Sequence, residues 1–239
     1  MPKRLLFIHH STGGNLIQKG KLRDLLYSKT DKVEFWDHGY NLFKNFSGTS
    51  SKSKFTKLMF RTGLSDKNGR MTGEDFQIQL SNNTPADFEN IFCANYTKNE
   101  TLKKIFEFDI IAFKNCFPAT KIDSDEKLEK YKDNYNNMSE AFKTYPNKIF
   151  IAFTPPPLRK EMTKHEYSKR AKTFAKWLST EWKKPKNVFV FDFFKLLSDK
   201  DGFLKKRYCS LIPLDSHPNT RANLDIAPEF VNLIIKLSK

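Results

Sequence analysis

The sequence has few cysteines and no long apolar run. Its 239 residues include three widely spaced cysteines, Cys93, Cys116 and Cys209. This odd number predicts neither a disulfide framework nor a CxxC metal pair. No uncharged apolar stretch approaches the roughly 20 residues that cross a bilayer. A disulfide-stapled scaffold and a membrane-spanning protein are therefore disfavoured, and the cysteine usage is typical of a reducing cytoplasm.

The N-terminus also lacks the features of an export signal. Residues 1–10 read MPKRLLFIHH, in which an apolar run of only four residues meets histidines rather than a small-residue cleavage site. We therefore expect a cytoplasmic protein with no membrane partner.

Arginine is scarce for so basic a chain. The 42 basic residues, of which only eight are arginine, outnumber 27 acidic residues and give a net charge of +15. Arginine is preferred for bidentate contacts with phosphates and bases, whereas lysines spread along a whole chain are typical of solvated surface. We expect no specific nucleic-acid partner. The positive net charge nevertheless supports one alternative, a non-catalytic basic binding protein.

Short apolar runs alternate with segments of helical periodicity. The runs predict strands at residues 5–9, 33–37, 109–114, 149–154 and 188–194. Helical spacing of apolar residues predicts helices around residues 16–26, 128–145, 167–182 and 230–235, with capping boxes at Asp123 and Glu126 and at Thr163 and Glu166. This order predicts a single domain over residues 1–239, a three-layer α/β/α sandwich with a mainly parallel, flavodoxin-like sheet of five strands.

The stretch from about residue 44 to 106 interrupts this alternation. It separates the second and third predicted strands and shows little periodicity, apart from a helix that Thr84 and Pro85 are expected to begin. It leaves the sheet near the edge where α/β proteins bind ligands. It is therefore either a lid or substrate-binding element, or a surface elaboration.

Polar residues with complementary chemistry follow the predicted strands. Ser11 follows the first strand, Gly39 the second and Asn115 the third, while Asp215 and His217 precede the last helix. A neutral serine needs a base within hydrogen-bond reach, and histidine has a suitable pKa. An amide such as that of Asn115 donates hydrogen bonds without titrating. Together these residues supply a nucleophile, a base, a carboxylate and oxyanion donors.

This order of residues resembles the SGNH hydrolase superfamily, also called GDSL-like esterases and lipases. The resemblance implies that Ser11 is the nucleophile, that His217 and Asp215 complete the triad, and that Ser11, Gly39 and Asn115 form the oxyanion hole. Histidines stand before Ser11 where the family has Gly-Asp, and Asp215 lies two rather than three residues before His217. The match is to an atypical branch.

The resemblance implies a serine esterase or deacylase that cleaves an O-acyl ester of a small molecule or a carbohydrate, with no cofactor and no metal ion. An acyltransferase that uses the same triad is the main alternative. Cys116 is an alternative nucleophile, although a lone cysteine after a buried strand is more often packed and inert. A GxxxxGK[ST] phosphate loop is absent. The oligomeric state does not follow from the sequence.

The spacing of Asp215 and His217 makes a local structural prediction. Residues two apart share one face of an extended chain, and Pro213 and Pro218 favour extended backbone in the residues before them. We therefore expect an extended segment over 214–217, with the Asp215 carboxylate bonded to the His217 ring.

Overall fold

A computed structural model describes residues 1–40, 62–80 and 83–239 of the chain. Its sheet has the strand order β3-β2-β1-β4-β5-β6, and every neighbouring pair is parallel except β2 and β3. The strands are β1 (Lys3–His9), β2 (Val33–Gly39), β3 (Gly63–Ser65), β4 (Ile110–Phe113), β5 (Ile149–Phe153) and β6 (Val188–Phe191). The mainly parallel α/β class is confirmed, but the described sheet has six strands rather than five.

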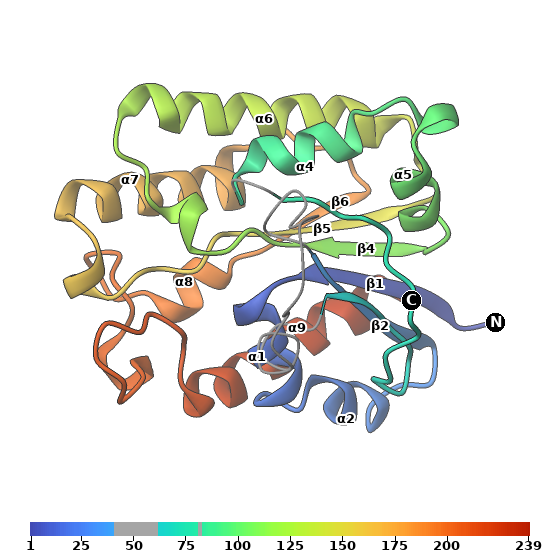
Figure 1. The fold of residues 1–239 in the computed structure, drawn as a ribbon, viewed down its shortest axis with the longest axis horizontal. Coiled ribbons are helices and arrows are strands. Elements are labelled where there is room, and N and C mark those ends of the chain that lie inside the picture. The colour runs from blue at the N-terminus through green and yellow to red at the C-terminus, as the bar shows by residue number, and fades with distance from the viewer. Residues whose placement is uncertain (41–61, 81–82) are drawn as a thin grey trace, which may run out of the picture.

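Helices cover both faces of the sheet, which gives three layers (Figure 1). One face packs against α1 (Ser11–Gln18), α2 (Leu22–Tyr27), α8 (Phe193–Leu197) and α9 (Thr220–Leu237). The other packs against α4 (Pro85–Phe92), α5 (Glu100–Ile105), α6 (Asp125–Lys143) and α7 (His165–Lys176). Short 3-10 turns lie at Tyr96–Lys98, Phe117–Thr120, Lys160–Met162 and Lys206–Tyr208, and a π-helix extends α7 over Trp177–Glu181.

The two layers of core follow from the alternation of side chains along each strand. In β4, Ile110 and Ala112 belong to the core under α1 and α9, whereas Ile111 and Phe113 belong to the core under α4 and α6. Both faces of the strand are buried, which is why a parallel strand is a continuous apolar run in the sequence.

Several predicted boundaries were wrong for identifiable reasons. The strand expected at 188–194 ends at Phe191, because the Asp192 side chain accepts a hydrogen bond from the Lys195 N–H and begins α8. The N-cap of α6 is Ser124 rather than Asp123. The N-cap of α7 is Lys164, whose side chain makes no cap, so the box at Thr163 and Glu166 does not form.

The helical pattern after β1 is divided between two helices. Lys21 has a φ of 52°, which is the left-handed region, and it separates α1 from α2. Gly20 lies at the same break, where a Cβ would stand 2.4 Å from the Leu16 carbonyl oxygen and 2.8 Å from that of Asn223 on α9. A side chain at position 20 would therefore keep α1 away from α9.

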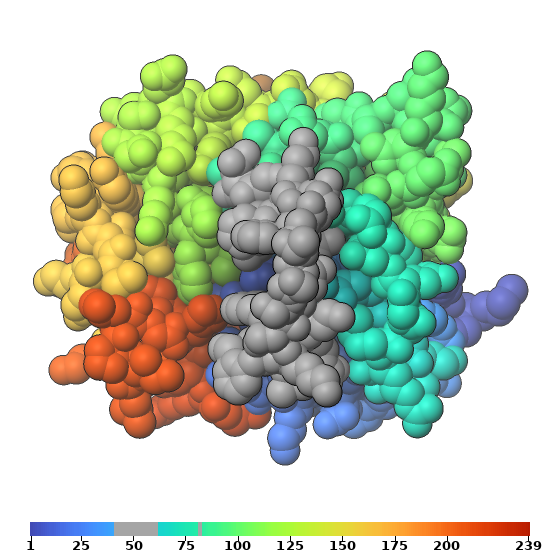
Figure 2. Space-filling view, in the orientation of Figure 1, coloured from blue at the N-terminus to red at the C-terminus, as the bar shows by residue number. Residues whose placement is uncertain are grey.

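Part of the 44–106 segment lies within the described residues, and residues 44–61 and 81–82 lie outside them. The described part contributes β3 at the edge of the sheet, then α4 and α5. The helix expected at Thr84 and Pro85 is confirmed as α4, and the Thr84 N–H donates to Asp87 Oδ2 at 3.0 Å. Figure 2 shows this part, coloured cyan to green, as a continuous band along one side of the face in view.

In the described parts of the chain, none of the helices has the length and apolar character that crossing a membrane requires.

Candidate active site

Ser11 stands where β1 passes into α1. His9 is the last residue of β1, and His10 is the extended N-cap of the helix, so Ser11 is the first helical residue. The N–H groups of Gly13 and Gly14 both donate to the His10 carbonyl oxygen at 2.9 Å. The N–H groups of Ser11 and Thr12 therefore form the open end of α1, where the helix dipole favours negative charge.

His217 contacts Ser11 from a loop more than 200 residues later in the chain. Its Nε2 lies 2.9 Å from Ser11 Oγ, and its Nδ1 lies 2.6 Å from Asp215 Oδ1. A carboxylate only accepts hydrogen bonds, so Nδ1 carries the proton and Nε2 is left to accept one from the serine hydroxyl. Ser11, His217 and Asp215 thus form one hydrogen-bonded chain.

The loop reaches this geometry by a turn and not by an extended chain. Leu214 has a φ of 61°, in the left-handed region, so the prediction of an extended segment over 214–217 was wrong at its first residue. The predicted contact between the Asp215 carboxylate and the His217 ring is present. Asp215 Oδ1 accepts both the His217 backbone N–H, at 2.9 Å, and the ring N–H. One carboxylate oxygen therefore fixes both the backbone turn and the ring, which explains how a spacing of two residues suffices.

The electrostatics of Asp215 keep it ionised. Partial burial opposes the charge, but the hydrogen bonds from the His217 N–H and ring outweigh it and lower the pKa of the Asp215 carboxyl below its usual value. The carboxylate therefore faces the imidazole as an anion throughout the neutral range.

Asn115 and Cys116 follow β4 and are both buried. Cys116 Sγ lies 3.6 Å from Ser11 Oγ. The Asn115 amide nitrogen donates to the Thr84 carbonyl oxygen at 3.0 Å, and of its two hydrogens this contact uses one. The His217 ring is bonded to Ser11 and not to the thiol, so the geometry favours the serine over Cys116 as nucleophile.

Gly39 occupies a different environment from the other predicted residues. It is the last residue of β2 and pairs with His9 of β1 and with Gly63 of β3. The Tyr40 N–H donates to the His9 carbonyl oxygen. Since successive N–H groups of a strand point to opposite sides, that of Gly39 points toward β3, away from the turn that carries Ser11. The structure does not bring this donor to the serine.

A cavity of about 300 Å³ opens beside Ser11 and His217. It runs along α1 to β2, and its polar lining includes His10, Asn15, Lys19 and Arg23.

Burial, together with the nearby His9, Lys114 and His217, lowers the pKa of His10 to about 4, so this ring is neutral at pH 7. The cavity therefore joins the serine to a polar wall that holds both neutral and cationic groups.

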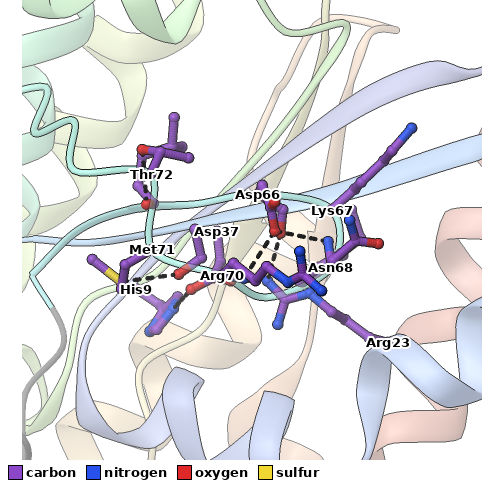
Figure 3. A network of polar contacts seen from close by, with 12 residues as sticks. His9, Arg23, Asp37, Asp66, Lys67, Asn68, Arg70, Met71 and Thr72 are labelled. Atoms are coloured by element: carbon purple, nitrogen blue, oxygen red, sulfur yellow. Dashed lines mark hydrogen bonds and ion pairs between the residues drawn. The ribbon is translucent and has the colours of Figure 1, made fainter.

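The far wall of this cavity contains a buried ionic network that the sequence patterns did not predict (Figure 3). Asp37 of β2 bonds His9 Nε2 at 3.0 Å through one carboxylate oxygen and Arg23 of α2 through the other. Burial opposes ionisation of Asp37, but these partners lower the pKa of its carboxyl. His9 and Asp37 lie near the carboxyl ends of adjacent strands, and this shared position is the signal that was available in the sequence.

The close packing of α1 on His9 leads to a test with a matched control. A Cβ added at Gly13 would lie 2.4 Å from His9 Cβ, whereas one at Gly14 would meet its nearest neighbour at 3.5 Å. We expect Gly13→Ala to lower the free energy of unfolding by about 1–3 kcal/mol, and Gly14→Ala to leave it unchanged or raised by up to about 1 kcal/mol. Denaturant unfolding measures both free energies. Equal stability of Gly13→Ala and Gly14→Ala would contradict the close packing of Gly13 on His9.

No protein-family model matches the sequence, and no curated protein matches it. Among solved structures, the chain is similar to a mutant acetyl esterase crystallised with an acetate ion, at 14% identity and a TM-score of 0.47. It is also similar to a family 3 carbohydrate esterase from Talaromyces cellulolyticus, at 13% identity and a TM-score of 0.46. Each match covers 100% of this chain and 98% of the other. Likenesses this remote do not assign the chain to a family.

Proposed function

We propose that the protein is a serine hydrolase that cleaves an O-acyl ester, with Ser11 as nucleophile, His217 as general base and Asp215 as the residue that orients the base. The observation that supports this most directly is the hydrogen-bonded chain from Ser11 Oγ through the His217 ring to Asp215 Oδ1, at 2.9 and 2.6 Å. These three residues lie beside a cavity that can hold a substrate. Ser11 also stands at a helix N-terminus, where the negative charge of an acyl-transfer intermediate is stabilised.

The proposed reaction has two stages. Ser11 Oγ attacks the ester carbonyl while His217 Nε2 takes the hydroxyl proton, and His217 then gives that proton to the leaving alcohol. In the second stage His217 takes a proton from water, the hydroxide attacks the acyl-serine, and the carboxylic acid leaves as Ser11 regains its proton. Asp215 stabilises the imidazolium in both stages.

The negative oxygen of each tetrahedral intermediate needs donors. We assign this role to the Ser11 N–H at the open end of α1 and to the second hydrogen of the Asn115 amide. We do not assign Gly39 to the oxyanion hole, because its N–H points toward β3. Its role as an oxyanion donor stays an expectation from the sequence resemblance.

The proposed substrate class is a small O-acyl ester, with a carbohydrate as the candidate alcohol. A cavity of about 300 Å³ accommodates a short acyl ester but not a long acyl chain in addition to a large alcohol. Its hydrogen-bonding wall suits a hydroxylated leaving group better than an aliphatic one.

Covalent labelling tests the proposal directly. A fluorophosphonate probe is expected to modify Ser11 and no other residue, as mapped by mass spectrometry of the digested protein. Heat-unfolded protein is the control, since it keeps every hydroxyl but loses the contact between Ser11 and His217. Failure of the folded protein to react, or equal reaction of the unfolded protein, would refute the proposed function.

Asn115 provides a second test, of the oxyanion role. We expect Asn115→Ala to lower kcat about 10²- to 10³-fold with little change in KM, because the amide acts on the transition state more than on the bound ester. Steady-state kinetics with an aryl acetate measure both constants. An effect confined to KM would show that Asn115 contributes to substrate binding instead.

A further inference from the structure

Lys114 is a charged residue at a core position. It follows β4, and its backbone N–H still donates to the Ile8 carbonyl oxygen of β1. The alternation that buries Ile110 and Ala112 under α1 and α9 therefore directs Lys114 to the same side. Its relative exposure is 0%, where an apolar residue is the usual occupant.

The ammonium group lies directly below the open end of α1. It donates to Thr12 Oγ1 in the first turn of the helix and to the Asn115 carbonyl oxygen at 3.0 Å. It also lies 5.7 Å from the centre of the Phe193 ring of α8. Lys114 thus connects the two segments that carry the proposed oxyanion donors, the first turn of α1 and the loop after β4.

Lys114 makes no ion pair within the described ranges. None of the Asp or Glu oxygens there lies within 4 Å of its Nζ. Asp192, at the start of α8, directs its Oδ1 to Thr154 and to the Lys195 N–H. A buried cation beneath a helix N-terminus, which is itself partly positive, is unfavourable in the resting protein. It becomes favourable when a negative charge forms above it.

We propose that Lys114 is a positioning residue of this site, which holds the first turn of α1 against the loop after β4 and supplies an unpaired internal cation that favours the oxyanion. The proposal rests on the hydrolase function proposed above. It explains why a residue that costs folding free energy occupies a core position. Lys114 touches no reacting atom, so it acts through Thr12, Asn115 and the field at the helix end.

The protonation of Lys114 offers a readout of this role. Burial lowers the pKa of the Lys114 ammonium to about 8, and the neighbouring Cys116 acts on this pKa in the opposite direction. Among the described residues His10, which precedes α1, also feels the charge of Lys114, and its own lowered pKa of about 4 leaves it neutral at pH 7. The wild-type kcat is therefore expected to fall as the pH rises through about 8, where the cation is lost.

The test compares Lys114→Met with the wild type, because methionine approximates the length of the side chain without its charge. We expect kcat to fall about 10- to 100-fold with KM little changed, which is less than the loss of a direct donor. The alkaline decline of kcat near pH 8 should disappear with the charge. Lys205→Met is the control, since Lys205 is a partly buried lysine whose ammonium donates to the Leu196 carbonyl oxygen, away from the site.

Stability measurements separate this role from a structural one. Between about pH 8 and the ordinary lysine pKa of 10.5, the unfolded chain binds a proton that the folded chain does not. The wild-type free energy of unfolding should therefore rise with pH across this window, relative to that of Lys114→Met. Below pH 8 the variant should be at least as stable as the wild type, because it removes an uncompensated charge.

The possible failures are distinguishable. An active wild type whose Lys114→Met variant keeps both its kcat and its alkaline decline overturns the inference and leaves the hydrolase intact. A variant that is slower only because it is less stable shows that Lys114 has a structural role, which also overturns it. A wild type that neither hydrolyses esters nor reacts with the fluorophosphonate refutes the proposed function itself.

Discussion

Replacing Ser11 by alanine is expected to lower the kcat for hydrolysis of a short-chain aryl ester by about 10⁴- to 10⁶-fold while the protein stays folded. A loss of that size is typical when a nucleophile is removed and the other groups that bind the transition state remain. The serine hydroxyl makes contacts with His217 and Cys116, and neither is needed to pack the helix end. Circular dichroism and denaturant unfolding check that the fold persists.

Cys116→Ala is the matched control for this prediction. Its sulfur lies 3.6 Å from the serine oxygen, so the substitution changes the surroundings of Ser11 without removing the proposed nucleophile. We expect this variant to keep most of the activity and to remain reactive toward the fluorophosphonate. The opposite pattern, with Ser11→Ala active and Cys116→Ala inactive, would make the thiol the nucleophile.

The central strands were predictable because burial on both faces requires continuous apolar runs. The edge strand β3 was not, because its three residues, Gly-Leu-Ser, form no run and no alternation. Helix starts were predicted less well than strands. Asp123 and Ser124 both precede α6, and Thr163 precedes Lys164, which is the N-cap of α7. Which residue becomes the N-cap depends on how the chain enters the helix, and a single sequence does not specify that.

The hydrogen-bonded residues of the site were predicted by their positions at the ends of strands and before the last helix. The residues around them were not. Lys114 is one of many lysines in the sequence. Its burial follows only from the alternation of side chains along β4 and from the packing of α1 over that side of the sheet. Asp37 and Arg23 likewise become partners through the parallel pairing of β1 and β2 and the docking of α2. Such contacts depend on tertiary structure and leave no local pattern.

Replacing Asp215 by asparagine is expected to lower kcat by up to about 10⁴-fold, with a smaller effect on KM. The carboxylate oxygen that accepts the ring N–H also accepts the His217 backbone N–H, so the turn itself depends on one negatively charged acceptor. A neutral amide holds the ring less firmly and no longer stabilises the imidazolium that forms when Ser11 gives up its proton. If the amide nitrogen turns toward the ring, it also favours the wrong tautomer, with the proton on Nε2.

The control for Asp215 is Asp225→Asn, because Asp225 also makes a short hydrogen bond, to the Tyr208 hydroxyl at 2.9 Å, but lies on α9 away from Ser11. That variant should keep its kcat. The lowered pKa of Asp215 adds a condition on pH, since the carboxylate stays ionised well below neutrality and the acid decline of wild-type activity must come from another group. If Asp215→Asn hydrolyses the ester at nearly the wild-type rate, Ser11 and His217 act as a dyad. The 2.6 Å contact between Asp215 Oδ1 and His217 Nδ1 would then only stabilise the turn.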